Sequence, residues 1–380
     1  MRVLVFTTVF PNPAQPLHGL FVLERVRHAA RHAAVRVVAP VAWHRRRPGA
    51  AIPRRARCAG LPVEHPSFVY IPGIFKGLDG LFLALSAVRR VARVRRGFDF
   101  DLIDAHFAFP EGFAAVLLGR WFGRPVTITL RGTEILLAAH RPRRWALRWA
   151  LRRADRVIAV AQPLADLARA LGVPADRVAV IENGVDTARF NRFMLPDTSK
   201  KRVRVGCVAN LRAVKNIDGL MRAAKAACER FPQLAFEVAG EGDQRPELER
   251  LHADLGLGDR FKLKGSVPEV AAFLRTVEVA VLPSHSEGMS NALLEKMSAG
   301  RAVVATDVGA NAELVEHGRS GLVVPPGDGA ALVEAIGAYL ANPLKAAAFG
   351  AAARKRVEAE YSRAAMTRRF EDYYHALAGR

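Results

Sequence analysis

Short apolar runs rich in β-branched residues recur along this chain, and segments with a helical spacing of apolar residues separate most of them. The runs in the first half are VLVFTT (3–8), VRVVAPV (35–41), DLIDAHF (101–107), VTITL (126–130), RVIAVA (156–161) and VAVIE (178–182). Strands this apolar, alternating with helices, are typical of a parallel sheet that helices cover on both faces. The pattern therefore predicts the α/β fold class.

The alternation restarts after a polar segment. Residues 191–201, NRFMLPDTSKK, contain a proline and turn-forming residues, and we interpret them as a linker. Further apolar runs follow at 203–210, 234–240, 261–265, 279–284, 302–308 and 321–326. At 380 residues the chain is also longer than one core usually supports. We predict doubly wound, Rossmann-like domains at 1–190 and 202–365, with a helix at 366–380 that packs toward the first domain.

The positive charge of the chain is concentrated in its first half. Residues 1–200 hold 32 Lys and Arg but 14 Asp and Glu, which is +18 of the +21 for the whole chain. This asymmetry predicts an anionic partner for the N-terminal domain: nucleic acid, an anionic membrane surface or a phosphorylated substrate. The sequence has no recognised nucleic-acid module, and basic charge alone supports only non-specific, salt-sensitive binding.

Cysteine usage and hydropathy exclude several other classes of protein. The three cysteines, Cys58, Cys207 and Cys228, lack any paired spacing, so neither a disulfide framework nor a zinc site is indicated. The longest apolar stretch, GLFLALSAV at 80–88, is about half the length that a membrane-spanning helix needs. The N-terminal segment has no export signal. We therefore expect a cytoplasmic protein without a membrane-spanning helix.

Two glutamates, Glu287 and Glu295, flank the start of a predicted helix in SEGMSNALLEKMSAG. Gly288 allows the backbone to approach a ligand closely. In a fully helical segment the two carboxylates would lie ~12 Å apart along the axis, beyond the 5 to 9.5 Å or so of a glycosidase pair. The spacing better suits the two ends of a nucleotide sugar whose anionic middle rests on the helix N-terminus. The alternative is a solvated Glu287 and a surface ion pair at Glu295.

A second anion site is predicted where VANLRAVKN leads from a strand into a helix. Asn216 is the expected cap of that helix, so Lys215 lies at a helix N-terminus, where free amides and the dipole favour an anion. We interpret Lys215, together with Arg212, as ligands of a phosphate. The alternative is that both are solvated loop residues.

Polar residues also follow two strands of the N-terminal half. His106 ends the run at 101–107, and the turn from Arg131 to Glu134 follows the run at 126–130. A lone histidine is more often structural than catalytic. Because two adjacent strands direct these groups to one cleft, we expect a functional role for His106.

Together these segments resemble the retaining glycosyltransferases of family 4, which have the two-domain GT-B architecture. The resemblance covers nearly the whole chain and rests on residues 154–190, 208–224 and above all 286–328, which contain the family's E-x7-E motif. It implies that two Rossmann-like domains face each other across a cleft. It also implies transfer of a sugar, with retention, from a nucleoside diphosphate sugar to a lipid-linked or cell-envelope polysaccharide acceptor. UDP- or GDP-sugars are the expected donors, with no further cofactor.

The resemblance implies a role for each candidate residue. Glu287 would contact the donor sugar and favour positive charge at its anomeric carbon, and Glu295 would bind the ribose hydroxyls. Lys215 and Arg212 would neutralise the leaving diphosphate, so no metal is expected. His106 completes the expected catalytic set. The other expected donor-binding residues are Gly19, Asn210, Gly288, Met289, Ser290 and Asn291, of which Ser290 or Asn291 can also cap the helix.

The chain departs from the family at three positions. Asn210 stands where the family often has arginine, so either Arg212 supplies that charge or the site has one positive charge fewer. Arg131 and Glu134 stand where many relatives have a histidine and an aspartate, and we expect them to contact the acceptor or the sugar. The first loop is reduced to PLHGLF, which leaves Gly19 as the glycine that approaches the diphosphate.

A basic segment, RPRRWALRWALRRADR, indicates a membrane partner. Arg144, Arg148 and Arg152 are spaced four residues apart beside Trp145 and Trp149, as in a helix that lies on anionic lipid. The alternative is that the tryptophans lie in the core and the arginines only point outward. We expect a peripheral protein on the inner face of the cell membrane.

Two other functions are open alternatives at this point. A sugar-nucleotide epimerase could share the fold, but it would form product without an acceptor. A nucleic-acid-binding protein is suggested by arginine clusters such as HRRRPGAAIPRRAR at 44–57. A gel shift that disappears at physiological salt would discount this alternative.

Overall fold

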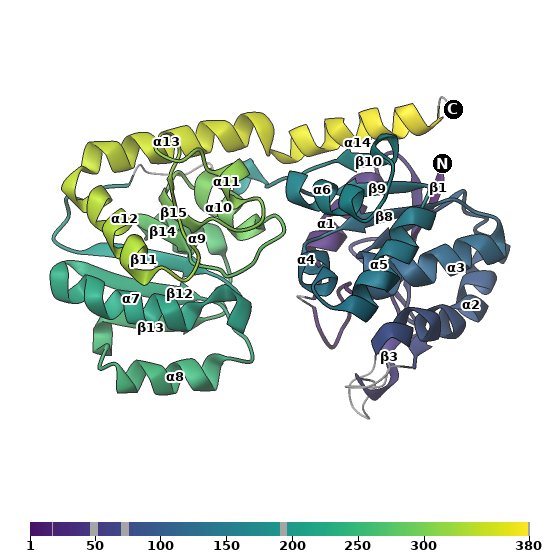
Figure 1. The fold of residues 1–380 in the computed structure, drawn as a ribbon, viewed down its shortest axis with the longest axis horizontal. Helices are drawn as coiled ribbons and strands as arrows, with labels where there is room; N and C mark the ends of the chain where they lie inside the picture. Colours follow the sequence, from purple (N-terminus) through teal and green to yellow (C-terminus); the bar gives the residue numbers. More distant parts are fainter. Residues whose placement is uncertain (17, 46–51, 70–75, 191–195, 379–380) are drawn as a thin grey trace. The chain divides into compact units, whose positions relative to one another are not determined.

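The computed structural model describes residues 1–380 except 17, 46–51, 70–75, 191–195 and 379–380. The chain divides into two compact units, drawn in Figure 1. Unit 1 comprises Met1–Ile181 with Arg369–Arg380, and unit 2 comprises Glu182–Arg368. The division therefore falls at Ile181, ahead of the expected linker. Residues 191–195 of that linker lie outside the described residues, and 196–201 belong to unit 2.

Unit 1 is built on one eight-stranded sheet in the order β10-β9-β8-β7-β1-β2-β5-β4. Its strands are β1 (Arg2–Phe6), β2 (Ala34–Val38), β4 (Arg55–Cys58), β5 (Leu61–Glu64), β7 (Leu102–His106), β8 (Val126–Leu130), β9 (Arg156–Ala159) and β10 (Val178–Val180). All neighbours pair in parallel except β4 and β5 at the edge. A separate small sheet pairs β3 (Val41–Ala42) with β6 (Ser67–Phe68).

Helices connect the strands of unit 1, as a parallel sheet requires. They are α1 (Leu20–Ala29), α2 (Asp79–Gly97), α3 (Phe113–Phe122), α4 (Thr133–Ala138), α5 (Arg141–Arg153) and α6 (Gln162–Ala170). Every residue of β7 and β8 is buried, because these central strands are covered on both faces. The last helix, α14 (Arg363–Ala378), begins in unit 2. Its residues from Arg369 on belong to unit 1, where the Arg25 guanidinium lies 4.4 Å from the ring centre of Phe370.

Unit 2 is built on a six-stranded parallel sheet in the order β13-β12-β11-β14-β15-β16. Its strands are β11 (Val203–Val208), β12 (Leu234–Ala239), β13 (Phe261–Gly265), β14 (Val279–Leu282), β15 (Ala302–Thr306) and β16 (Leu322–Val324). Its helices are α7 (Ile217–Arg230), α8 (Arg245–Asp254), α9 (Val270–Arg275), α10 (Asn291–Ser298), α11 (Asn311–Leu314), α12 (Gly329–Ala341) and α13 (Pro343–Glu360).

The helices of unit 2 are amphipathic, and their apolar faces close its core. The buried residues of α7 recur every three or four positions and so form one face of the helix: Ile217, Leu220, Met221, Ala224 and Ala227. Burying each of the large apolar side chains contributes about 1.5–3 kcal/mol. Helices α7 and α12 pack against each other, as do α10 and α13. The α/β class and the two doubly wound sheets predicted from the sequence are confirmed.

The strand order places a ligand crevice in each unit. In unit 2 the chain builds outward from β11 to β13 and then returns to the other side of β11 with β14. In unit 1 the same reversal occurs between β1 and β7. Loops that leave such a switch point in opposite directions open a crevice beyond the carboxyl ends of the two strands. In unit 2 these are the loops at 209–216 and 283–290.

In the described part of the chain, no helix is both long and apolar enough to cross a membrane.

Candidate active site

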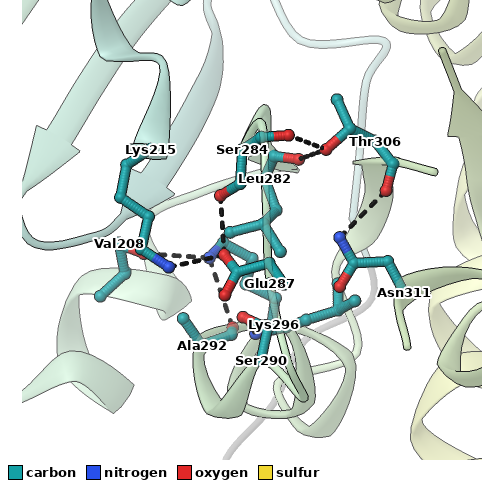
Figure 2. Close-up of polar contacts among 11 residues, drawn as sticks. Val208, Lys215, Leu282, Ser284, Glu287, Ser290, Ala292, Lys296, Thr306 and Asn311 are labelled. Atoms are coloured by element: carbon teal, nitrogen blue, oxygen red, sulfur yellow. Dashed lines mark hydrogen bonds and ion pairs between the residues drawn. The ribbon is translucent and has the colours of Figure 1, made fainter. Parts of the chain in front are cut away.

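The two switch-point loops of unit 2 bring a lysine and a glutamate together. Lys215 ends a short 3-10 turn after β11, and Glu287 lies in the loop between β14 and α10. Lys215 Nζ is 2.6 Å from Glu287 Oε1, and Ser284 Oγ donates to the same oxygen at 2.7 Å (Figure 2). Glu287 is buried and Lys215 is partly exposed. A fixed carboxylate and a cation therefore meet at the mouth of the crevice.

Hydrogen bonds to backbone carbonyls hold the Glu287 loop in place. Thr306 Oγ1 donates to Ser284 O at 2.6 Å, and Asn216 Nδ2 donates to Pro283 O at 3.1 Å. Asn311 Nδ2 in turn donates to Thr306 O at 3.0 Å (Figure 2). Buried carbonyls need such partners, so these side chains set the path of the loop. Asn216 occupies the predicted cap position of α7, but its side chain makes this contact instead of capping the helix.

Gly309 allows the neighbouring loop to approach the glutamate closely. Its φ is +57°, and a Cβ at this position would lie 2.1 Å from Glu287 O. The amide of Ala310 then donates to Gly288 O at 2.9 Å. Any larger residue at 309 would force this contact apart.

The N-terminus of α10 lies next to Glu287. Helix α10 begins at Asn291, so Glu287 and Gly288 lie in the loop and the segment is not helical throughout. Ser290 is the residue that caps the helix, because its Oγ accepts from the amide of Leu293 at 3.3 Å. Free amides at this end of the helix favour an anion. Met289 is buried, and its sulfur accepts from the amide of Asn183 at 3.0 Å.

Glu295 is the only one of the two motif glutamates within α10. It is half-buried, and burial raises the pKa of its carboxyl, while nearby Lys296 and Arg189 oppose that shift. Arg212 and Asn210 are exposed on the loop after β11. Among the described residues, no side-chain hydrogen bond or ion pair joins either of them to the Lys215 and Glu287 pair.

A buried lysine behind this pair was missed in the sequence. Lys296 has no exposed surface, and its Nζ donates to Val208 O and to Ala292 O, each at 3.3 Å (Figure 2). Burial lowers the pKa of this ammonium, while nearby carboxylates such as Glu287 oppose the shift. Helical spacing could have revealed it, because position 296 falls one turn after the buried Leu293.

In unit 1, His106 is buried and contacts other protein groups. Its side chain has no exposed surface, and its Nδ1 lies 2.9 Å from Arg131 Nη2. A guanidinium can only donate, so Nδ1 is the acceptor and the ring proton is on Nε2, which lies 3.7 Å from Asp104 Oδ2. Burial, with Arg131 and Arg25 nearby, lowers the pKa of the ring, so the imidazole is neutral. In this geometry the His106 ring contacts the Arg131 guanidinium inside the protein.

Glu134 binds the loops after β7 and β8 to each other. It is fully buried, and its carboxylate accepts from the amides of Ala108 (3.0 Å), Arg131 (3.0 Å) and Gly132 (2.8 Å). A carboxylate engaged in this way holds the Arg131 turn in place. Arg131 itself is half-buried and lies 5.4 Å from the ring centre of Phe21.

Gly19 caps α1 with a φ of +76°. A Cβ at this position would lie 2.4 Å from Val9 O, so the turn requires a glycine whatever else approaches it.

Residues 19–189 match a family model described as Glycosyltransferase Family 4, and residues 202–342 match one described as Glycosyl transferases group 1. A lipopolysaccharide core biosynthesis mannosyltransferase from Rhizobium leguminosarum is 32% identical over 64% of this chain and 70% of its own length. A putative teichuronic acid biosynthesis glycosyltransferase from Bacillus subtilis is 26% identical over 89% of both chains.

Solved structures share the fold over the whole chain. HepE from Anabaena, determined in complex with UDP, has a TM-score of 0.77 at 20% identity, with 99% of this chain and 100% of that chain covered. Sucrose-phosphate synthase from Thermosynechococcus elongatus has a TM-score of 0.83 at 20% identity, with 100% and 99% covered. Both likenesses concern the fold.

A buried carboxyl at the switch point of unit 1 makes stability depend on pH. Glu111 is buried and accepts from the hydroxyl of Thr8, and burial raises its pKa to about 7. Its contribution to stability is complete below the ordinary pKa of a glutamate and is lost as pH rises through about 7. Glu111→Gln should remove this dependence and stabilise the protein relative to wild type at pH 8, by roughly 3 kcal/mol at most.

Urea unfolding at pH 4.5 and pH 8 measures this difference. The exposed Glu229→Gln is the matched control and should leave the pH dependence unchanged. Parallel pH profiles for wild type and Glu111→Gln would contradict the prediction.

Proposed function

The chain belongs to the group 1 and family 4 glycosyltransferases, and on that premise we propose that it transfers a sugar from a nucleoside diphosphate sugar with retention at the anomeric carbon. The observation that carries the proposal is the Lys215 and Glu287 pair, held at the switch point of unit 2 beside the N-terminus of α10. Across two neighbouring loops it combines a carboxylate for a sugar with a cation and helix amides for a diphosphate.

The donor would enter by competing for Lys215. In the structure the Lys215 ammonium forms an ion pair with Glu287. A diphosphate carries more negative charge and would compete with Glu287 for this ammonium. Glu287 would then contact the sugar hydroxyls and support the positive charge that develops at the anomeric carbon. The amides of Gly288, Met289 and Ser290 would meet the phosphates. HepE, a structural neighbour, was also determined with UDP-glucose, which supports a nucleotide sugar and makes UDP-sugars the first donors to test.

The remaining donor contacts follow from their places in unit 2. Glu295 would bind the ribose hydroxyls, for which a half-buried carboxylate on α10 is suited. Arg212, exposed on the loop after β11, would add a second positive charge to the leaving diphosphate. With two cations and the helix amides in these roles, we propose that the reaction needs no metal. Asn210 and Asn291 are the further proposed donor contacts of unit 2, and Gly19 is a proposed donor contact in unit 1.

The reaction would proceed on one face of the sugar. The bond from the anomeric carbon to the diphosphate oxygen breaks, and the acceptor hydroxyl attacks from the same side. The hydroxyl proton passes to an oxygen of the departing diphosphate, so no protein nucleophile is needed. Glu287 and Lys215 stabilise opposite charges that develop in this step.

The acceptor is proposed from relatives and from unit 1. The relatives are named for the biosynthesis of lipopolysaccharide core, amylovoran and teichuronic acid. These names support a glycan acceptor of the cell envelope, or a lipid-linked precursor of one. Arg131 is the proposed acceptor contact, with His106 and Glu134 as the residues that position it.

Helix α5 is the proposed contact with the membrane. Arg144, Arg148 and Arg152 are exposed, and Trp145 is 61% exposed. Trp149 is different, because its ring packs against Phe113 with centroids 4.3 Å apart. One tryptophan of the pair therefore supports the membrane interpretation and the other serves packing.

The first test of the function is a screen of UDP-, GDP- and ADP-sugars for release of the nucleoside diphosphate. Glu287→Gln and Lys215→Ala should each lower turnover about 100-fold or more, because each removes charge stabilisation from the transition state. The exposed Lys225→Ala is the matched control and should keep wild-type turnover. Near-normal activity in either site variant would remove that residue from the mechanism, and an inverted product in NMR spectra would refute retention.

Lys296→Met tests the buried ammonium behind the pair. Methionine keeps much of the volume, and replacing a buried charge by an apolar group is often neutral for stability. Turnover should nevertheless fall about 10- to 100-fold, because the end of β11 and α10 lose their shared donor and the site shifts. Thermal midpoint and turnover are measured together. Unchanged turnover at unchanged stability would contradict the prediction.

Vesicle flotation tests the membrane contact. Wild type should bind vesicles with anionic lipid and not neutral ones. Arg144→Gln with Arg148→Gln should lose roughly 2 kcal/mol of binding free energy, because each arginine near such a surface contributes about 1 kcal/mol. Arg222→Gln with Lys225→Gln in unit 2 removes the same charge and should bind as wild type. Equal binding to neutral and anionic vesicles would refute the contact.

A further inference from the structure

The outer edge of unit 1 contains a groove of about 420 Å³. The hairpin of β4 and β5, with strand β2, forms one side, and helix α2 forms the other. The charged residues that line it are Arg36, Arg55, Arg57, Arg93 and Glu64. Four guanidinium groups therefore share the groove with one carboxylate.

That carboxylate is already engaged on both oxygens. Arg55 Nε lies 3.2 Å from Glu64 Oε1, and Arg90 Nη1 of α2 lies 2.8 Å from Glu64 Oε2. The Glu64 side chain is 14% exposed between them. Each of its oxygens therefore already lies within ion-pair distance of one arginine.

The other three guanidinium groups have no carboxylate partner in the described part of the chain. Arg36 lies 5.1 Å from the ring centre of Phe98, and Arg57 Nη1 donates to Gly60 O at 3.3 Å. Arg93 is exposed on α2. The segments outside the described residues contain no Asp or Glu, so their side chains cannot supply the missing carboxylates. The groove thus concentrates unbalanced positive charge, which raises the local concentration of anions.

We propose that this groove binds a small ligand with two closely spaced phosphate groups, such as a diphosphate or a doubly phosphorylated sugar. Two phosphate groups bring a charge of about −3 to −4 at neutral pH, which matches three free guanidinium groups. Guanidinium forks also fit phosphate oxygens in a bidentate manner. None of the residues that line the groove is a proposed donor contact, so the two sites are distinct.

The size and lining of the groove favour a small molecule over a membrane surface or a nucleic acid. Its volume falls within the range of about 300 to 1,000 Å³ that small-ligand sites have. Pro62, Val63 and Val94 add an apolar part to the lining, against which the rest of such a ligand can pack. A lipid surface would need a protruding face, and α5 already offers one with an exposed tryptophan.

Titration calorimetry with inorganic pyrophosphate at physiological salt tests the proposal. Wild type should show two binding events, one in the groove and one at Lys215. The variant Lys215→Met should keep only the groove event. Adding Arg57→Gln and Arg93→Gln to Lys215→Met should weaken that event about tenfold or more for each guanidinium removed, since each charged hydrogen bond contributes about 1.5–3 kcal/mol. Both arginines are exposed, so the fold should persist, and thermal midpoints check this.

The matched control adds Arg148→Gln and Arg152→Gln to Lys215→Met, which removes the same charge from α5 of the same unit. Pyrophosphate binding should stay unchanged in this control. An equal loss in the control would show general attraction to a basic unit and overturn the proposal. So would wild-type affinity in the groove variant, or an effect of Arg57 and Arg93 on anionic vesicles or RNA but not on pyrophosphate. The readout is binding alone, so a failure of the proposed sugar transfer leaves it intact.

Discussion

The contact between Lys215 and Glu287 depends on the strand order of unit 2, and the candidate site depends on that contact. Because β14 returns to the side of β11, two loops far apart in sequence meet at 2.6 Å. The Glu287 side chain is 8% exposed, so its charge needs a partner, and removing one partner of a buried pair typically costs about 3–5 kcal/mol. Lys215 supplies it from a side chain that is 21% exposed and can reach solvent. The pair therefore gives the buried carboxylate a cationic partner whose own side chain stays partly exposed.

Three buried carboxyl groups in unit 1 are accommodated in other ways. Glu134 accepts from three backbone amides and so holds two loops together. Glu111 has the hydroxyl of Thr8 but, among the described residues, no cation within ion-pair distance, and burial raises its pKa to about 7. Burial also raises the pKa of Asp104, although Arg25 and Arg131 oppose the shift. Glu287 differs from these three carboxylates because its partner is a lysine that is itself partly exposed.

The sequence predicted elements well and side-chain directions poorly, for a physical reason. Periodic apolar runs identify strands and helices. Ser290 is predictable as a helix cap because a serine hydroxyl before a helix can accept from an amide of the first turn. Every residue of β7 is buried, so alternation along that strand could not reveal that His106 points into the protein. The Asn216 side chain does not cap α7. Its Nδ2 instead donates to Pro283 O, which is 67 residues away in the sequence. Such contacts form only once the fold brings distant segments together.

The positive charge of the first half is another feature from which the sequence alone does not predict specific contacts. An excess of arginine predicts that the protein attracts anions, but it does not predict the shape of the anion that binds. On α5 the arginines accompany an exposed tryptophan, and the two together suit an extended interface with lipid. At the β4 and β5 edge the arginines surround a groove whose single carboxylate is already paired twice, so the uncompensated charge is confined to a small volume. The net charge of unit 1 adds the arginines of α5 to those of the groove. Which anion each surface binds depends instead on the exposed apolar groups and on the carboxylates near each arginine. For that reason the two surfaces of unit 1 are expected to bind different anions despite their similar composition.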